Sequence, residues 1–336
     1  MIRAAIVGIG TWGQNLVASV QGRSELVRFS AGTTRTPAKA AEFCARHGIR
    51  LVGSYEELLK SGEIDAIVLA TPHSMHAEQI VAAAKAGKHV FTEKPLGLDR
   101  ESSERAVAAC AERGVTLAVG YNWRFQPALQ EIRRMLEDGR LGKLLHIEGN
   151  FCGPSAYRFA RGHWRHDRAE VPAGGMTGRG VHVVDAMLYL AGKIESVHAQ
   201  SARLVQDFGM DDTTSMLFRF ASGASGYLGT VIATAETWRM QVFGSKGWAE
   251  VGDVEHLTTW QLRFCRFNKE NLSEKKQPEV IRFPATSTER AELEHFAKAV
   301  QERRRLALPG GDEVHNVAVL EAIVRSARDD GRVHIA

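Results

Sequence analysis

A cluster of glycines near the start of the chain is the first pattern that could bind a ligand. The run 8–13 reads G-x-G-x-x-G and directly follows the apolar segment 2–7, which predicts a buried strand, while residues 11–21 predict a helix. At such a turn, glycines allow a tight bend, close approach of the backbone to a phosphate, and close packing of helix on strand. The helix start attracts phosphates through its free N–H groups. We therefore predict a dinucleotide site containing Gly8, Gly10, Thr11, Trp12 and Gly13.

The turn after the second predicted strand, residues 26–32, indicates which dinucleotide is preferred. Folds of this kind that bind NAD(H) usually carry Asp or Glu there for the ribose hydroxyls. Here no carboxylate lies between Glu25 and Glu42, and the turn contains Thr34 and Arg35. Hydroxyls and a guanidinium bind the 2′-phosphate that a carboxylate would repel. We predict NADP(H) in preference to NAD(H); the alternative is that Arg35 is a solvated loop residue and NAD(H) is used.

A lysine follows the strand predicted over residues 89–92. Active sites of open α/β sheets lie outside the carboxyl ends of the strands, where Lys94 stands between Glu93 and Pro95. Partial burial shifts the pKa of a lysine ammonium toward neutrality and makes it a usable general acid or base. Lys94 is therefore a candidate for proton transfer, although a single lysine is more often a surface residue.

The order of the elements predicts two domains. Strands alternate with helices over residues 1–121, which predicts a doubly wound parallel sheet of the Rossmann type. Residues 122–336 are rich in strands joined by short glycine-containing turns, which predicts an antiparallel meander. Four helices are expected there, over residues 127–137, 181–190, 289–304 and 312–329.

Composition excludes several classes of protein. The net charge is only +4, and the basic residues form no aromatic-interleaved face, so we expect no nucleic-acid partner. No apolar run approaches the ~18 residues of a membrane span, and the predicted strand at residues 2–7 leads us to expect no secretory signal. The four cysteines include no Cys-x-x-Cys pair, and the histidines show no ligand spacing, so we expect neither a metal site nor a disulfide framework. These features favour a cytoplasmic protein.

Several segments in a fixed order resemble the glucose–fructose oxidoreductase / inositol dehydrogenase / MocA (Gfo/Idh/MocA) family of pyridine-nucleotide oxidoreductases. The resemblance covers nearly the whole chain, and its order and spacing are more specific than any single motif. The matching segments are residues 8–13, 71–76, 87–95, 120–127, 163–165, 174–185 and 291–296.

This resemblance implies a Rossmann domain over residues 1–121 and, over 122–336, an α+β domain built on a large, mostly antiparallel sheet. It implies homodimers or homotetramers that associate through that sheet. It implies Lys94 as the catalytic acid/base and His182 as its partner at the reacting hydroxyl. Further cofactor-binding positions implied in this way are Thr71, Pro72, His76, Glu93, Lys94 itself and Asn122.

One position departs from the family pattern. Where the family usually reads Asp-x-Gly-x-His, this chain has Gly178 in place of the carboxylate, with His182 retained. Three interpretations are open: Gly178 makes room for a larger substrate, Asp167 substitutes for the carboxylate, or catalysis has been lost. We favour the first two, because Lys94 and His182 are both present. Trp164 and Arg165 are candidate substrate-lining residues, and Arg165 suits a carboxylate-bearing substrate.

The sequence thus predicts a dehydrogenase that transfers hydride between the nicotinamide and a hydroxyl-bearing carbon of a sugar, inositol or related polyol. A first alternative is a dehydrogenase of a cis-dihydrodiol or a carboxylated cyclic substrate, motivated by Gly178 and Arg165. A second alternative, from another class, is a non-catalytic NADP(H)-binding regulator.

Overall fold

The computed structural model describes residues 1–304, 306 and 313–335. The chain divides into two units, Met1–Asn122 with Ser287–Ala307, and Trp123–Thr286 with Leu308–Ala336. The sequence predicts a single boundary between residues 121 and 122. In the structure the first unit also contains Ser287–Ala307, which that boundary would assign to the second domain. The Asp312 start expected for the last helix lies outside the described residues.

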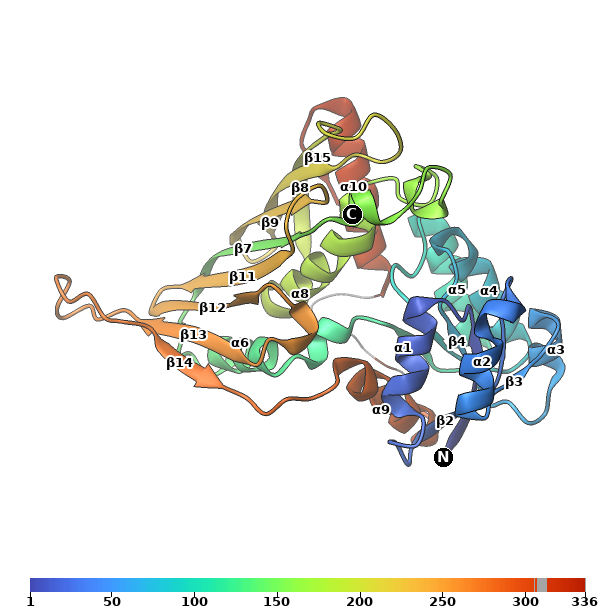
Figure 1. The fold of residues 1–336 in the computed structure, drawn as a ribbon. Helices are drawn as coiled ribbons and strands as arrows, with labels where there is room; N and C mark the ends of the chain where they lie inside the picture. The colour runs from blue at the N-terminus through green and yellow to red at the C-terminus, as the bar shows by residue number, and fades with distance from the viewer. Residues whose placement is uncertain (305, 307–312, 336) are drawn as a thin grey trace. The chain divides into compact units, whose positions relative to one another are not determined.

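The first unit is built on a six-stranded parallel sheet in the order β3-β2-β1-β4-β5-β6, the Rossmann arrangement that the sequence predicts (Figure 1). Ligand sites in this topology lie where the strand order reverses, between β1 and β4, at the carboxyl ends. The strands are β1 (Ile2–Val7), β2 (Val27–Thr33), β3 (Arg50–Leu51), β4 (Ala66–Leu69), β5 (His89–Thr92) and β6 (Leu117–Val119).

Helices cover this sheet and close its core. Helices α1, α2 and α9 share one hydrophobic cluster with β1 and β2, in which Phe296 of α9 meets Phe91 of β5 edge to face at 5.9 Å. Helix α4 packs against α5 and on strands β4 and β5. The helices of this unit are α1 (Thr11–Val20), α2 (Pro37–His47), α3 (Tyr55–Lys60), α4 (His76–Lys85), α5 (Arg100–Glu112) and α9 (Thr288–Gln301), with the 3-10 turn η1 (His73–Met75).

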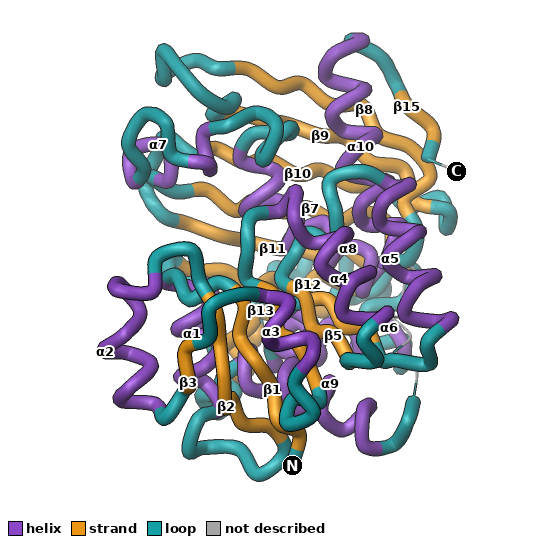
Figure 2. Tube along the Cα trace, turned by 90° about the vertical axis from the view of Figure 1, so that its right-hand side faces the viewer, coloured by secondary structure: helices purple, strands orange, loops and turns teal. Residues whose placement is uncertain are grey.

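The second unit is built on a nine-stranded sheet in the order β14-β13-β12-β11-β7-β10-β9-β8-β15. All neighbours run antiparallel except β7 and β10, so the mostly antiparallel sheet is confirmed. Figure 2 shows β7 to β13 and β15 of this sheet in orange. The strands are β7 (Leu144–Cys152), β8 (Ile194–Ala202), β9 (Thr213–Phe220), β10 (Ser225–Val231), β11 (Thr237–Gly244), β12 (Gly247–Asp253), β13 (Gln261–Arg266), β14 (Glu279–Arg282) and β15 (Val333–His334).

Helices pack on one face of this larger sheet. Helix α8 is buried almost throughout and packs against β7, α6 and α10, as its apolar sequence requires. On β9 buried and exposed residues alternate, and Leu217 and its cross-strand neighbour Tyr227 are exposed. The helices and turns are η2 (Asn122–Phe125), α6 (Pro127–Glu137), α7 (Ser155–Arg158), η3 (Trp164–His166), the π turn η4 (Met176–Gly180), α8 (Val181–Ala191), η5 (His256–Thr258) and α10 (Glu313–Asp329).

None of the helices in the described part of the chain combines the length and apolar character that a membrane crossing requires. Strands β13, β14 and β15 and the π turn were not among the elements expected from the sequence.

Candidate active site

The three glycines of the β1–α1 turn have different surroundings. A Cβ on Gly8, whose φ is +91°, would lie 2.4 Å from the Ala70 carbonyl oxygen, and a Cβ on Gly13 would lie 2.1 Å from the Gly8 carbonyl oxygen. A Cβ on Gly10 would meet nothing within 4 Å. Packing therefore demands glycine at positions 8 and 13, whereas position 10 borders open space, as a pyrophosphate site requires.

The start of α1 is suited to an anion. Gly10 is the N-cap residue and has no side chain that could accept a bond from the first-turn N–H groups, and no acidic residue lies in that turn. Thr11 is exposed at the first helical position. The N–H groups and the positive end of the ten-residue helix are thus available to phosphates.

The turn after β2 contains the two residues predicted to select the dinucleotide. Thr34 is half-buried and Arg35 is exposed. Among the residues that the structure describes, no carboxylate forms an ion pair with Arg35. Its guanidinium can therefore bind an anion at this turn.

The segment after β4 braces the first unit. His76 is fully buried, with Nδ1 2.7 Å from the Pro95 carbonyl oxygen and Nε2 3.1 Å from that of Thr71. The Thr71 hydroxyl donates to Gln79 Oε1 at 2.6 Å. His76 thus ties the loop after β4, which contains Pro72, to the loop after β5, and so fixes the backbone beside Lys94.

Glu93 is the buried carboxyl of the site, with 6% of its surface exposed. Burial raises the pKa of this carboxyl to about 7, and the charge of Glu289 contributes in the same direction. The Lys94 charge and the Trp12 indole act in the opposite direction and lower the pKa. The Trp12 indole lies near the carboxyl but outside hydrogen-bond geometry. A Cβ on Gly120 would lie 2.9 Å from Glu93 Oε1, so a side chain at this position would have to displace the carboxyl.

The buried polar atoms of the first unit that have no hydrogen-bond partner among the described residues include Trp12 Nε1, Glu93 Oε1 and Asn122 Oδ1. Asn122 is 1% exposed, and its Nδ2 donates to the Thr288 hydroxyl at 3.2 Å. A nicotinamide carboxamide, with two N–H donors and one carbonyl acceptor, has the groups that would satisfy them. The residues present therefore fit a pyridine dinucleotide.

Lys94 directly follows Glu93 and is half-buried, and its peptide bond to Pro95 is cis. It belongs to the first unit, whereas His182 belongs to the second.

His182 lies in an aromatic cluster of the second unit. It is 5% exposed in the first turn of α8 and stacks on Trp123, with ring centroids 5.5 Å apart and an interplanar angle of 19°. Phe151 and His256 lie 6.2 Å from its ring. Trp123 Nε1 donates to His256 Nδ1 at 3.1 Å. The stacking fixes the plane of the His182 imidazole.

The π turn before α8 contains the position where the family carboxylate is absent. A Cβ on Gly178 would meet nothing within 4 Å. The next side chain, Arg179, is turned toward β7, where it donates to the Cys152 carbonyl at 2.8 Å and to Glu236 Oε1 at 2.7 Å. It also lies over the Phe151 ring at 4.6 Å. Position 178 is thus open, while position 179 is firmly held.

The other predicted substrate residues lie in and beside η3. Trp164 and Arg165 are half-buried and pack on each other, with the guanidinium 4.4 Å from the indole centroid. Asp167 is exposed, and its carboxylate accepts a bond from the Ala169 N–H at 2.9 Å. In the structure Asp167 therefore stabilises a turn.

The structure brings the predicted cofactor residues Trp12 and Glu93 together at the carboxyl edge of the first sheet. Sequence reasoning missed the partners of His182, above all His256, which stands in the β12–β13 connection with no motif to mark it. Trp123 was noticed only as part of the segment 120–127.

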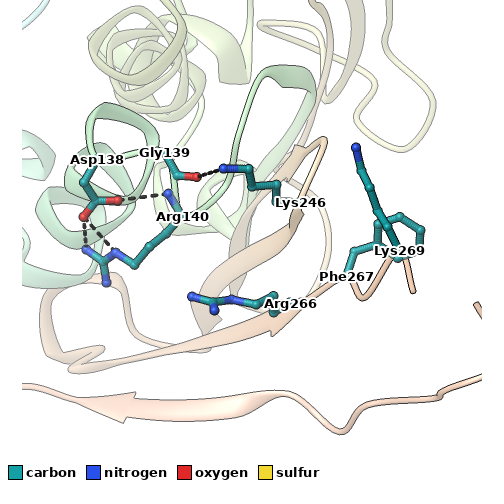
Figure 3. Close-up of a pocket in the computed structure, with 7 residues that line it drawn as sticks. All are labelled: Asp138, Gly139, Arg140, Lys246, Arg266, Phe267 and Lys269. Carbon is teal, nitrogen blue, oxygen red and sulfur yellow. Dashed lines mark hydrogen bonds and ion pairs between the residues drawn. The ribbon is translucent and has the colours of Figure 1, made fainter. Parts of the chain in front are cut away.

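A hollow of about 420 Å³ in the second unit contains none of the predicted site residues. Figure 3 shows that its charges are partly neutralised, because Arg140 is paired with Asp138 and Lys246 donates to the Gly139 carbonyl at 3.1 Å. The remaining lining residues are Arg266, Phe267 and Lys269. Within the described residues, no group of His, Cys, Asp or Glu side chains could hold a metal ion.

Two family models match the chain. Residues 2–121 match the model described as "Oxidoreductase family, NAD-binding Rossmann fold", and residues 129–250 match the "GFO/IDH/MocA C-terminal domain".

Known proteins resemble the chain over most of its length. Inositol 2-dehydrogenase of Rhizobium meliloti (strain 1021) is 26% identical over 342 residues, which cover 100% of this chain and 99% of that protein. Trans-1,2-dihydrobenzene-1,2-diol dehydrogenase of Sus scrofa is 30% identical over 226 residues, which cover 66% of this chain and 65% of that protein. The crystal structure of aldose-aldose oxidoreductase from Caulobacter crescentus complexed with glycerol superposes with a TM-score of 0.87 at 25% identity and covers 99% of each chain.

Proposed function

The chain belongs to the Gfo/Idh/MocA family of NAD(P)-dependent oxidoreductases, and from this membership we propose that it is an NADP(H)-preferring dehydrogenase of a sugar, inositol or related polyol. The observation that carries the proposal is the pairing of an open phosphate turn at Gly10 with a buried carboxyl and a half-buried lysine at the same sheet edge. The names of the relatives, an inositol 2-dehydrogenase and an aldose-aldose oxidoreductase, support a polyol substrate.

In the proposed mechanism, Lys94 takes the proton of the substrate hydroxyl during oxidation and returns it during reduction. His182, fixed by its stacking on Trp123, holds the reacting oxygen. The nicotinamide, when bound, supplies the hydride chemistry. The residues proposed to hold the dinucleotide are Gly8, Gly10, Thr11, Trp12, Gly13, Thr34, Arg35, Thr71, Pro72, His76, Glu93, Lys94 and Asn122.

Replacement of the lysine tests this mechanism. In Lys94→Ala the proton acceptor is lost, and we expect kcat to fall by about 10²–10⁴-fold. The Kd for NADPH, measured by fluorescence titration, should stay within a few-fold, because the phosphate turn is unchanged. A panel of glucose, myo-inositol and a dihydrodiol with NADP⁺ at alkaline pH supplies the assay. Near-full turnover by the variant would refute the role of Lys94.

The cofactor preference rests on Thr34 and Arg35. Arg35→Ala should raise the KM for NADP⁺ about tenfold or more, since one charge-assisted bond contributes about 1.5–3 kcal/mol, and should leave the KM for NAD⁺ nearly unchanged. A wild-type kcat/KM that favours NAD⁺ would overturn the preference. The matched control is Lys39→Ala, because Lys39 is also an exposed cation and lies close in sequence, in the first turn of α2.

A second candidate substrate class is favoured by the open space at Gly178. A cis-dihydrodiol or carboxylated ring would use that space, with Arg165 or Trp164 lining it. The similarity to a trans-1,2-dihydrobenzene-1,2-diol dehydrogenase supports a dihydrodiol as the substrate class, although the name of that relative specifies the trans isomer. Tight NADP(H) binding with no turnover on any member of the panel would instead favour the non-catalytic regulator.

We also propose a homodimer or homotetramer associated through the larger sheet, because Leu145, Leu217 and Tyr227 are exposed on it. Light scattering on the purified protein tests this, and the 36.9 kDa mass of a single chain would contradict it. None of the four cysteines forms a disulfide, which is consistent with the proposed cytoplasmic location.

A further inference from the structure

The hollow of about 420 Å³ in the second unit is lined by four cations and a single carboxylate. That carboxylate, Asp138, accepts bonds from the Arg140 backbone N–H at 3.0 Å and from its guanidinium at 2.8 Å, so it serves Arg140. Within the described part of the chain, no carboxylate forms an ion pair with Lys246, Arg266 or Lys269. Three positive charges therefore line one hollow without a counter-charge (Figure 3).

The pairing of β12 with β13 brings two of these cations together. Arg266 is the cross-strand partner of Gly247, the residue that follows Lys246. A Cβ on Gly247 would lie 2.2 Å from the Cys265 carbonyl oxygen, so the two backbones are in close contact. The Phe267 N–H donates to the Lys246 carbonyl at 2.7 Å and fixes the turn against the end of β13. The backbone thus holds Lys246 and Arg266 as neighbours.

The wall formed by the segment after α6 is joined to the same turn. The Ser245 N–H donates to the Lys143 carbonyl at 2.9 Å, and the Lys143 N–H donates to the Ser245 hydroxyl at 3.0 Å. The Lys246 N–H donates to the Leu141 carbonyl at 3.0 Å, and its ammonium donates to the Gly139 carbonyl at 3.1 Å. The hollow is therefore bounded by segments that are bonded to one another, and such preorganisation lowers the entropic cost of binding.

The charge and size of the hollow indicate a class of ligand. Cations that line one hollow without a counter-charge attract anions, and their mutual repulsion is relieved most by a multivalent anion. The fork of Arg266 suits two phosphate oxygens, whereas Lys246 and Lys269 act as point charges. The volume of about 420 Å³ lies within the roughly 300–1,000 Å³ of small-molecule sites. The hollow thus fits a small polyanion.

We propose that this hollow is a second ligand site, distinct from the dehydrogenase site, which binds a small molecule that carries two or more phosphate groups. A single phosphate monoester carries a charge of only about −2 at neutral pH and leaves one of the three cations uncompensated. Inorganic polyphosphates and sugar bisphosphates share the required chemistry. Phe267, which is 49% exposed, borders the hollow and offers an apolar face to the carbon skeleton of a sugar bisphosphate.

Isothermal titration calorimetry on the full chain tests the proposal. The protein is first saturated with NADPH, so that the phosphate turn at Gly10 does not compete for the probes. Tripolyphosphate and fructose 1,6-bisphosphate are the probes, and they distinguish an inorganic from a sugar-linked ligand. We expect at least one of them to bind with a Kd between about 1 µM and 1 mM at low salt. Inorganic phosphate should bind about tenfold more weakly, since it engages one cation fewer.

Two double variants connect the binding to the hollow. Arg266→Ala with Lys269→Ala should raise the Kd about 100-fold, because each substitution removes one charge-assisted bond. The matched control is Arg282→Ala with Lys193→Ala, which removes the same charge from exposed positions of the same unit. Arg282 lies opposite Gln261, at the other end of β13 from Arg266, and the control should keep the wild-type Kd.

The Tm and the dehydrogenase turnover of both double variants should match those of the wild type, because the substituted side chains are exposed and lie outside the proposed active site. Absence of binding by both probes would overturn the proposal. An equal rise in Kd in the two double variants would overturn it as well, since the attraction would then come from the net charge of the chain rather than from the hollow.

Discussion

Replacement of the second glycine by alanine should separate cofactor binding from folding. Gly10 has φ −81° and ψ −171°, an extended conformation open to any residue, and its added Cβ would meet no protein atom within 4 Å. Alanine is a poorer N-cap than glycine by less than about 1 kcal/mol, and the reduced chain entropy offsets part of this loss. We expect the Tm of Gly10→Ala to lie within about 3 °C of the wild type.

The cost should appear in cofactor affinity instead. The methyl group would occupy the space through which the backbone reaches the pyrophosphate, so one or two charge-assisted bonds are lost. At about 1.5–3 kcal/mol each, a loss of about 3 kcal/mol corresponds to roughly a 100-fold rise in Kd. Fluorescence titration with NADPH measures the Kd, and thermal unfolding of the cofactor-free protein measures the Tm.

Two further alanine variants serve as controls. Gly62 also has open space around its would-be Cβ, and Gly62→Ala should change neither Kd nor Tm appreciably. In Gly13→Ala the Cβ would lie 2.1 Å from the Gly8 carbonyl oxygen, and a clash of this kind costs about 1–3 kcal/mol or more. A wild-type Kd for Gly10→Ala, or a Tm loss as large as that of Gly13→Ala, would refute the reasoning.

Two predictions concern buried charges. Burial raises the pKa of Glu93 from 4.5 to about 7, so the folded state holds a proton that the unfolded chain releases, and stability falls as pH rises through this window. Glu93→Gln should remove that loss. The cofactor-free variant should be more stable than wild type by about 3 kcal/mol at pH 8 and nearly equal to it at pH 4.5. Free energies of unfolding measured in urea test this, and the same difference between variant and wild type at both pH values would contradict it. The Arg124 guanidinium lies 2.7 Å from the Asp185 carboxylate, and the two side chains are 8% and 1% exposed, respectively. Arg124→Leu should therefore lower the free energy of unfolding by about 3–5 kcal/mol in the same assay. Arg219→Leu, which breaks the exposed pair with Glu195, should cost less than about 1 kcal/mol, and similar losses in both variants would contradict the burial argument.

Features written in neighbouring residues could be predicted from the sequence. The glycine turn, the parallel sheet and the helix that begins at Val181 follow from local periodicity and turn chemistry. The return of α9 to the first unit could not, because an amphipathic pattern predicts a helix without identifying the surface it covers. In the structure Phe296 and Leu293 of α9 pack into the core that α9 shares with α1.

The site was predictable to the same degree. The glycines of the run 8–13 can be recognised from their spacing in the sequence. His256, in contrast, lies near His182 only because β12 and β13 pair in one register within the second sheet. The π turn at Met176–Gly180 gives no signal either, since its sequence contains Gly178 and Gly180, which suit a loop equally well.

The absence of a carboxylate at position 178 does not leave His182 loosely held. Arg179, in the same turn, is anchored to the Cys152 carbonyl and to Glu236, and therefore fixes the backbone that leads into α8. Trp123 fixes the plane of the imidazole from the other side by stacking. The orienting role of a neighbouring carboxylate is thus supplied by a cation bound to β7 and by an aromatic face. The chain keeps an oriented histidine beside the open space at Gly178, which is why we retain the enzyme over the non-catalytic regulator.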